Sequence, residues 1–216
     1  MKINDLEIID LNEESILQKD KEDISETIGR QRTSTESEDS LDWKEELKSW
    51  VMTLVITVVV CLVLKNYIII NASVPTGSME NTIMPGDNIL GYRLAYLLEE
   101  PERGDVIFFP FPDDESKKYV KRIIGLPGEN IYIRDGEIYI NDSLTPLEEP
   151  YLKEEWIVGT GPFEFQVPED SYLVLGDNRN NSDDARYWNN SYVMEEKIIG
   201  KAIFTYFPIS RWGMVE

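Results

Sequence analysis

The sequence predicts an all-β domain of antiparallel strands, in a sheet or barrel-like arrangement, that follows one N-terminal transmembrane helix. Three observations predict it: one long apolar run near residue 50, many short β-rich segments after it, and Pro, Gly, Asp and Asn between those segments. Such punctuated short segments are typical of sandwiches and barrels. The chain therefore divides into a tail at 1–46, a membrane anchor at 47–70 and a β-rich domain at 71–216.

The tail is acidic and poor in aromatic residues. Residues 1–49 hold fifteen acidic and seven basic side chains. A segment of this composition buries too little apolar surface to offset the entropy lost on folding. We therefore expect a disordered tail that lies in the cytoplasm.

The apolar run is the candidate membrane span. Residues 50–64 carry no charge, and with 67–70 about 20 residues are available to cross hydrocarbon. Trp50 and Tyr67 lie at positions typical of interfacial belts. A buried core strand or helix is the alternative, but the chain offers no similarly apolar partner segment. A long acidic segment rather than a short basic leader precedes the run, which favours an uncleaved signal-anchor.

The charges around this run indicate its orientation. Lys44 and Lys48 precede it, which favours a cytoplasmic N-terminus and a β-rich domain outside the cytoplasm. The whole chain carries a net charge of −20, which disfavours nucleic acid as a partner.

The expected strands alternate with turn residues. They lie at 88–92, 105–109, 119–126, 130–133, 137–140, 163–167, 172–175 and 202–207. Asp135 and Gly136 separate two of them and predict a tight hairpin. Short helical turns are expected at 93–100 and 194–197, and residues 141–161 are expected to form an exposed excursion.

Histidine is absent from the chain, and Cys61 is the single cysteine and lies in the apolar run. Histidine-activated nucleophiles and histidine- or cysteine-ligated metal sites are therefore excluded. Any hydrolytic chemistry in this chain must use another base, for which a neutral lysine is the obvious candidate.

Ser78 and Lys121 are the candidate catalytic pair. Pro75 and Gly77 precede the serine and favour a turn that presents its hydroxyl. A β-turn serine and a solvated surface lysine are the ordinary alternatives for each residue alone. Because lysine titrates near about 10.4, a base poised near pH 7 to 8 needs a pKa lowered by roughly three units. The fold must therefore bury Lys121 if it acts as a base.

A polar loop at 175–186 follows an expected strand. It is dense in Asp, Asn, Ser and Arg side chains, which can bond backbone or hold a base. A polar hairpin tip and a calcium loop are alternatives. Calcium is disfavoured because Arg179 and Arg186 interrupt the acids, which lack the regular spacing of an EF-hand.

Together, these segments resemble type I signal peptidases. The motifs, in order, are Ser78-Met79, Arg103-Gly104-Asp105-Val106, the run 121–128 that begins Lys121-Arg122, and Gly176-Asp177-Asn178-Arg179 with Ser182, Asp184 and Arg186. The resemblance covers roughly residues 45–210 and matches the compact, single-span bacterial form. It implies a signal peptidase-like β fold and a Ser-Lys dyad, with no metal or cofactor.

The resemblance implies roles at the reacting bond. Ser78 is the expected nucleophile and Lys121 the expected general base. The expected oxyanion donors are the Ser78 amide and the Thr76 hydroxyl, where the family frequently has serine. Asn81 and Ala185 are further departures, since the family usually has proline at the first position and commonly serine at the second.

It also implies a supporting set around the lysine. Ser182 is expected to hold Lys121, while Asp184 and Arg186 are expected to form an ion pair, with Arg122 nearby. A carboxylate next to the amine would raise its pKa. We therefore expect that Asp184 is neutralised by Arg186 or Arg122 and does not contact Lys121.

The expected function is that of a membrane-bound serine endopeptidase in the plasma membrane. By resemblance, it removes N-terminal signal peptides from secreted preproteins by cleaving after small residues, as in Ala-X-Ala. Eight residues separate Ile70 from Ser78, so the nucleophile lies at most about 28 Å from the end of the span. The partners implied are preproteins and the lipid bilayer.

Two alternatives differ in kind. A Ser-Lys self-cleaving repressor of related fold is disfavoured by the membrane span and by the lack of a DNA-binding helical module. A non-catalytic membrane-tethered β-domain that binds peptides or partners remains open, and for it Ser78 and Lys121 are incidental.

Overall fold

The computed structural model describes residues 21, 24–26 and 43–216, so most of the tail predicted at 1–46 lies outside the described residues. The chain separates into two compact units, Met1–Val59 and Val60–Glu216. The second unit contains the strands and the site.

The apolar run forms helix α2 (Trp43–Val63), which continues as a π-helical turn, η1 (Leu64–Ile68). This stretch is long and apolar enough to cross a membrane, and its apolar side chains are exposed rather than packed against the rest of the protein. Ile69 and Ile70, placed by the sequence at the end of the anchor, instead pair with Tyr92 and Gly91. The difference arises because backbone pairing, which apolarity does not reveal, begins at Ile69.

The β-domain consists of short strands and 3₁₀ turns. The strands are β1 (Ile69–Ser73), β2 (Asn88–Tyr92), β3 (Val106–Phe111), β4 (Asp114–Gly125), β5 (Asn130–Arg134), β6 (Glu137–Ile140), β7 (Phe163–Gln166), β8 (Ser171–Leu175), β9 (Tyr192–Met194), β10 (Gly200–Phe207) and β11 (Gly213–Met214). The 3₁₀ turns are η2 (Arg179–Asn181), η3 (Glu195–Lys197) and η4 (Ile209–Arg211).

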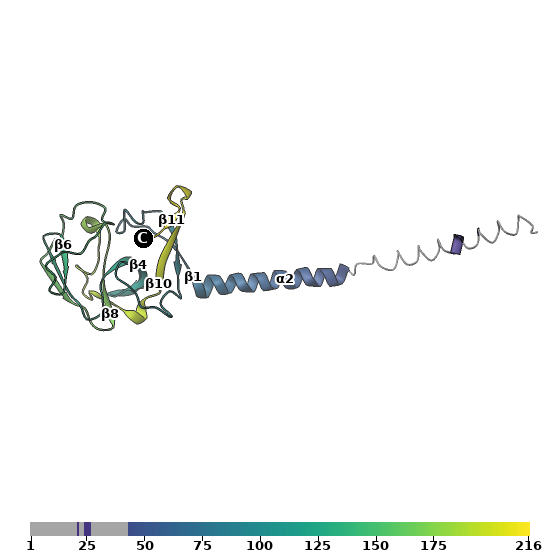
Figure 1. The fold of residues 1–216 in the computed structure, drawn as a ribbon, viewed down its shortest axis with the longest axis horizontal. Coiled ribbons are helices and arrows are strands. Elements are labelled where there is room, and N and C mark those ends of the chain that lie inside the picture. Colours follow the sequence, from purple (N-terminus) through teal and green to yellow (C-terminus); the bar gives the residue numbers. More distant parts are fainter. Residues whose placement is uncertain (1–20, 22–23, 27–42) are drawn as a thin grey trace, which may run out of the picture. The chain divides into compact units, whose positions relative to one another are not determined.

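The strands pair antiparallel, as the sequence predicts, and form two sheets. The larger sheet has the order β1-β2-β10-β3-β4-β8-β9, with β11 added to β10, and the smaller has the order β6-β5-β7. β1 and β6 lie on opposite sides of the domain in Figure 1. The predicted hairpin is confirmed: Asp135 and Gly136 have φ of 51° and 78° between β5 and β6, the geometry that a two-residue type I′ turn requires.

Two hydrophobic clusters hold the domain together. The larger includes Ile123, Ile124 and Leu173 from β4 and β8. The smaller includes Met79 and Phe108. Each fully buried side chain of this size contributes about 1.5–3 kcal/mol. Because Met79 follows Ser78 directly, burial of its side chain fixes the turn that carries the candidate nucleophile.

Residues 141–161 form no helix or strand and are mostly exposed, as expected, but the segment is docked onto the domain at several points. Trp156 is only 5% exposed, Leu147 packs on the larger cluster, and Glu149 forms an ion pair with Arg179. We call this segment the strap. Pro, Glu and Gly indicate an exposed loop, but the few aromatic and apolar side chains between them dock it onto the domain.

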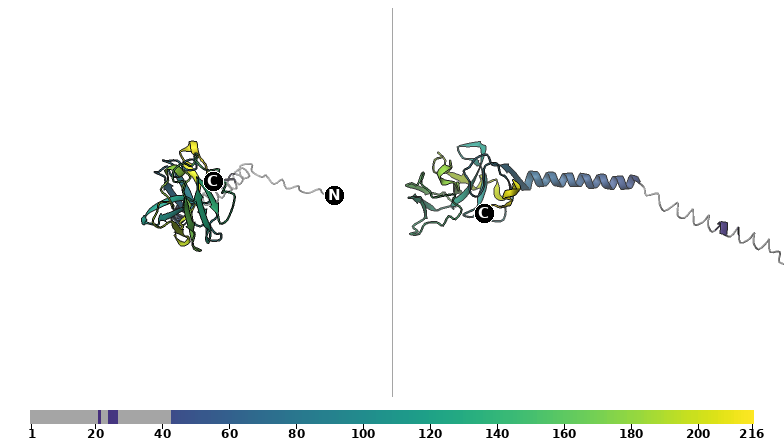
Figure 2. Two further views of the ribbon diagram at one scale, coloured as in Figure 1. Left: turned by 90° about the vertical axis from the view of Figure 1, so that its left-hand side faces the viewer. Right: turned by 90° about the horizontal axis from the view of Figure 1, so that it is seen from above.

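Other local differences are small. Residues 93–100 form turns rather than a helix, while Glu195–Lys197 forms the expected helical turn as a 3₁₀ turn. Strands β1, β9 and β11 were not predicted. The C-terminal end lies against the β-domain (Figure 2), where the Glu216 carbonyl accepts a hydrogen bond from Arg122 at 2.9 Å.

Candidate active site

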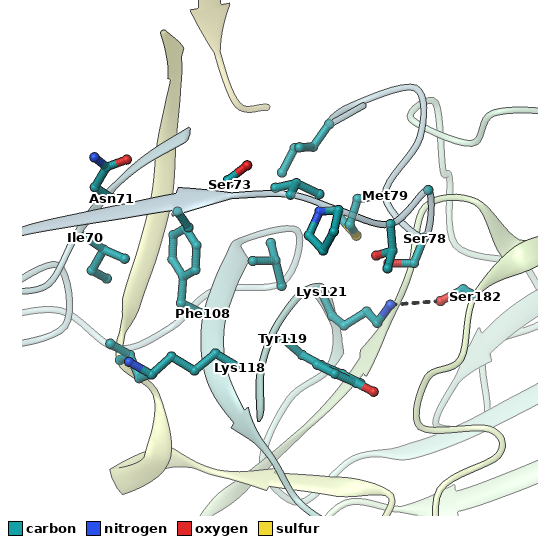
Figure 3. Close-up of a pocket in the computed structure, with 18 of the residues that line it drawn as sticks. Ile70, Asn71, Ser73, Ser78, Met79, Phe108, Lys118, Tyr119, Lys121 and Ser182 are labelled. Carbon is teal, nitrogen blue, oxygen red and sulfur yellow. Dashed lines mark hydrogen bonds between the residues drawn. The ribbon is translucent and has the colours of Figure 1, made fainter. Parts of the chain in front are cut away.

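Lys121 lies in β4, opposite Ile107 of β3, and only 3% of it is exposed. Its Nζ donates a hydrogen bond of 3.1 Å to Ser182 Oγ (Figure 3). Burial lowers the pKa of Lys121 from 10.5 to about 8, against the negative charges of Asp184 and Asp183, which raise it. A substantial fraction of the amine is therefore neutral slightly above physiological pH, as a general base requires.

Ser78 lies on the turn after β1 and lines the same pocket as Lys121 and Ser182 (Figure 3). Gly176 shows how tightly these parts approach one another. A Cβ on Gly176 would lie 2.2 Å from Ser182 Oγ and 2.5 Å from the Ser78 carbonyl oxygen. Only glycine fits between the two serines without displacing the Ser78 backbone or the partner of Lys121.

The hydrogen-bonding groups of Ser78 differ in their partners. Its carbonyl accepts a bond of 3.0 Å from Asn178 N. Within the described part of the chain, its hydroxyl and its N–H have no hydrogen-bond partner. Thr76 lines the same pocket and is exposed. Both residues that the sequence assigns to an oxyanion hole therefore line the pocket that contains Lys121.

Asp184 and Arg186 form the expected ion pair, and both side chains are fully buried. The bonds are 2.8 Å from Nε to Oδ1 and 2.9 Å from Nη2 to Oδ2. Asp184 Oδ2 also accepts from Gly176 N at 3.1 Å. Lys121 bonds Ser182 rather than this carboxylate. Asp184 supports the backbone of the site, and Arg186 offsets part of the effect of its charge on the pKa of Lys121.

Arg122 pairs with Asp177 and not with Asp184, the partner that the sequence analysis considered. Its Nε and Nη2 bond Asp177 at 2.9 and 2.7 Å, and its guanidinium lies 4.0 Å from the centre of the Tyr151 ring. Sequence reasoning named Asp177 only as part of a motif. Lys121 and Arg122 are consecutive in β4, and successive side chains of a strand point to opposite faces, which was the available signal for separate partners.

The strap braces the loop that carries Ser182. Arg179 donates to Gly176 O at 3.0 Å and to Glu149 Oε2 at 3.0 Å. Asn180 Oδ1 accepts from Ile157 N and Val158 N, both at 2.9 Å. These contacts are not predictable from the sequence, because nothing in the composition of the strap indicates that it packs against the loop that carries Ser182.

The pocket has a volume of about 1310 Å³. Its walls come from β1, the turn 74–79, β4 and the loop 179–183. Among the described residues, no group of three or more His, Cys, Asp or Glu side chains could hold a metal ion. The pocket brings the hydroxyls of Ser78 and Ser182 together with the buried Lys121 amine.

A serine hydroxyl beside a buried lysine, on an antiparallel β-domain that follows an apolar helix, defines a candidate serine hydrolase that works without histidine. Residues 47–207 match the model of the family described as signal peptidase, peptidase S26. The chain belongs to this family of serine endopeptidases.

The chain is similar to several bacterial proteins. It is 35% identical to the probable signal peptidase I-2 of Synechocystis sp. over 76% of this chain and 74% of that protein. It is also 35% identical to signal peptidase I of Bacillus licheniformis over 80% and 95% of the two chains. The crystal structure of a signal peptidase I from Enterococcus faecalis V583 is 36% identical, covers 48% of this chain and 97% of its own, and gives a TM-score of 0.41.

Proposed function

We propose that the chain removes signal peptides from secreted preproteins with Ser78 as nucleophile and Lys121 as general base. The observation that carries this assignment is the burial of the Lys121 amine, 3.1 Å from Ser182 Oγ, in the pocket that Ser78 also lines. Family membership supplies the reaction, and this geometry supports the residues that perform it.

The reaction follows from these positions. Neutral Lys121 takes the Ser78 proton as Oγ attacks the scissile carbonyl carbon, and the developing oxyanion accepts hydrogen bonds from the Ser78 N–H and the Thr76 hydroxyl. The Lys121 ammonium then protonates the leaving amine as the peptide C–N bond breaks, which leaves an ester on Ser78. Lys121, neutral again, deprotonates the water that hydrolyses this ester, and Ser182 holds the amine in place.

We further propose that α2 is a single membrane anchor with its N-terminus in the cytoplasm and the β-domain outside. Support comes from the exposed, apolar surface of the helix and from Lys44 and Lys48 before the apolar run. The nine-residue separation of Ile69 and Ser78 limits their distance to about 30 Å. The site then works near the bilayer surface, where the cleavage site of a membrane-inserted signal peptide emerges.

The substrate is proposed to bind as an extended peptide along β1. This strand lies at the end of the larger sheet, so one of its edges is unpaired within that sheet. Main-chain hydrogen bonds to such an edge hold a peptide in any sequence, and pockets for alternate side chains give selectivity. We propose small side chains, as in Ala-X-Ala, at the first and third positions before the cut.

The test is cleavage of a preprotein with an Ala-X-Ala site by the full chain in detergent. Ser78→Ala and Lys121→Met should be folded and inactive, whereas the exposed controls Ser116→Ala and Lys117→Met should cleave at the wild-type rate. Retained activity in either of the first two variants would refute the dyad. A preprotein with leucine at both small-residue positions should remain uncut.

The orientation has its own test. In sealed membrane vesicles of known sidedness, protease added from the cytoplasmic side should remove the tail and leave the β-domain intact. Digestion of the β-domain from that side would contradict the proposed topology.

A further inference from the structure

Asn178 contacts two consecutive carbonyls of the turn that carries Ser78. Its side-chain Nδ2 donates to Gly77 O at 2.9 Å, and its backbone N donates to Ser78 O at 3.0 Å. Asn178 itself is 1% exposed. One buried residue from the loop after β8 therefore fixes the peptide groups on both sides of the Ser78 Cα.

The first of these contacts determines where the Ser78 N–H points. Gly77 C=O and Ser78 N–H belong to the same peptide unit, which is planar and trans, so the two groups point in opposite directions. Holding the carbonyl on the Asn178 side directs the N–H to the other side. That N–H has no acceptor among the described residues, as expected of a donor kept for a ligand.

The amide of Asn178 has a single favourable orientation. Its Nδ2 faces Gly77 O and, at 3.4 Å, Glu80 Oε2, so a rotated amide would place oxygen against oxygen. In this orientation Asn178 Oδ1 is buried without a hydrogen-bond partner in the described part of the chain. The donor contacts of Asn178 are thus kept although its oxygen is left without a protein partner, and such a group calls for an explanation, of which a role in catalysis is one.

We infer that Asn178 is a positioning residue that aims the Ser78 N–H at the oxyanion; this assignment rests on the proposed function of Ser78. It acts through the Gly77 carbonyl and does not touch substrate. Loss of the Asn178 side chain removes one of the two hydrogen bonds to Gly77 O. The other remains, because Glu80 N still donates to this carbonyl at 3.2 Å. The effect is therefore smaller than that of deleting an oxyanion donor, which costs about a hundredfold or more.

The experiment compares Asn178→Ala and Asn178→Asp with the exposed control Asn189→Ala, using the full chain in detergent on the alkaline plateau of activity. Asn178→Asp keeps the size of the side chain but has no donor for Gly77 O. Both variants should lower kcat about tenfold to a hundredfold with KM within about twofold, because the oxyanion forms only after substrate binding. The control should match the wild type.

A second measurement distinguishes a misplaced Ser78 N–H from general damage to the fold of the variants. A peptide aldehyde with alanine at the first and third positions adds to Ser78 Oγ and forms an oxyanion, whereas the corresponding peptide alcohol does not. Both Asn178 variants should bind the aldehyde more weakly by the factor lost in kcat and bind the alcohol as the wild type does. If one variant does not fold, the other carries the test.

Three outcomes overturn the inference and are distinct from failure of the dyad. They are wild-type kcat in both variants, unchanged aldehyde binding despite a lower kcat, and parallel weakening of aldehyde and alcohol. In each case Ser78→Ala and Lys121→Met remain inactive if the proposed function holds. Activity in those two variants would remove the proposed function itself.

Discussion

Replacing Lys121 by methionine should abolish activity and stabilise the fold at neutral pH. Burial lowers the pKa of Lys121 from 10.5 to about 8, and each unit corresponds to about 1.4 kcal/mol. The buried ammonium therefore costs the folded state about 3 kcal/mol. Methionine is unbranched and apolar, and it fills the space of the Lys121 side chain without burying a charge. Loss of the bond to Ser182 offsets about 1 kcal/mol, which leaves a net gain of about 2 kcal/mol.

The pH dependence of this gain distinguishes it from simple repacking. Because the folded pKa lies below the unfolded value, the unfolded chain holds the proton to higher pH. The cost to the wild type is complete below pH 8 and disappears as pH rises from 8 to about 10.5. The stability advantage of Lys121→Met should therefore shrink by about 3 kcal/mol between pH 7 and pH 10.5, where the wild type is at least as stable.

The assay is denaturant unfolding of the full chain in detergent, followed by near-UV circular dichroism at both pH values. Lys118→Met removes an exposed lysine from the same strand and serves as the control, with no pH-dependent gain. A difference between Lys121→Met and wild type that is equal at pH 7 and pH 10.5 would show that the amine is not held at a lowered pKa, and would remove the physical basis for its role as a base.

Two further predictions concern charges around the site. Asp183→Asn removes a negative charge that raises the pKa of Lys121, so the acid limb of kcat/KM should move to lower pH and activity at pH 7 should rise. Glu149→Gln leaves the Arg179 guanidinium buried without its carboxylate, since the two side chains are 6% and 1% exposed, and should lower the free energy of unfolding by about 3–5 kcal/mol.

Matched controls exist for both predictions. Asp142→Asn removes an exposed charge on the strap and should leave the pH profile unchanged. Glu148→Gln removes the exposed neighbour of Glu149 and should change stability by less than about 0.5 kcal/mol. An acid limb that moves to higher pH in Asp183→Asn, or equal stability of the two glutamine variants, would contradict the respective assignment.

The sequence predicts most strands because their signals are local. Residues 88–92 and 137–140 match β2 and β6, since β-formers end there at turn residues. β1 was missed because its first residues continue the apolar run, and apolarity alone does not distinguish the end of a span from a strand that pairs with β2. β9 and β11 are only three and two residues long and carry no periodicity of their own.

The contacts that assemble the site were less predictable. Ser78 and Lys121 could be named from residue types, and Ser182 from the family resemblance. The partners of Arg122 and Arg179 depend on which distant segments meet. Asn81 illustrates the limit. It has a φ of 92° and donates to Tyr151 O at 3.0 Å, and a proline cannot adopt that φ. The departure from the usual proline is thus accommodated by a turn that contacts the strap.

An acidic chain faces a specific difficulty in keeping a lysine neutral, because every nearby carboxylate favours the ammonium. Buried carboxylates next to this loop are each matched by an arginine. The pairs are Asp177 with Arg122, Asp184 with Arg186 and Glu149 with Arg179. Asp184 and Arg179 also hold Gly176, through its N–H and its C=O respectively. Two of these pairs, Asp184 with Arg186 and Glu149 with Arg179, therefore also fix the glycine against which Ser78 and Ser182 pack, so the charge balance around the proposed base and the placement of the proposed nucleophile share contacts.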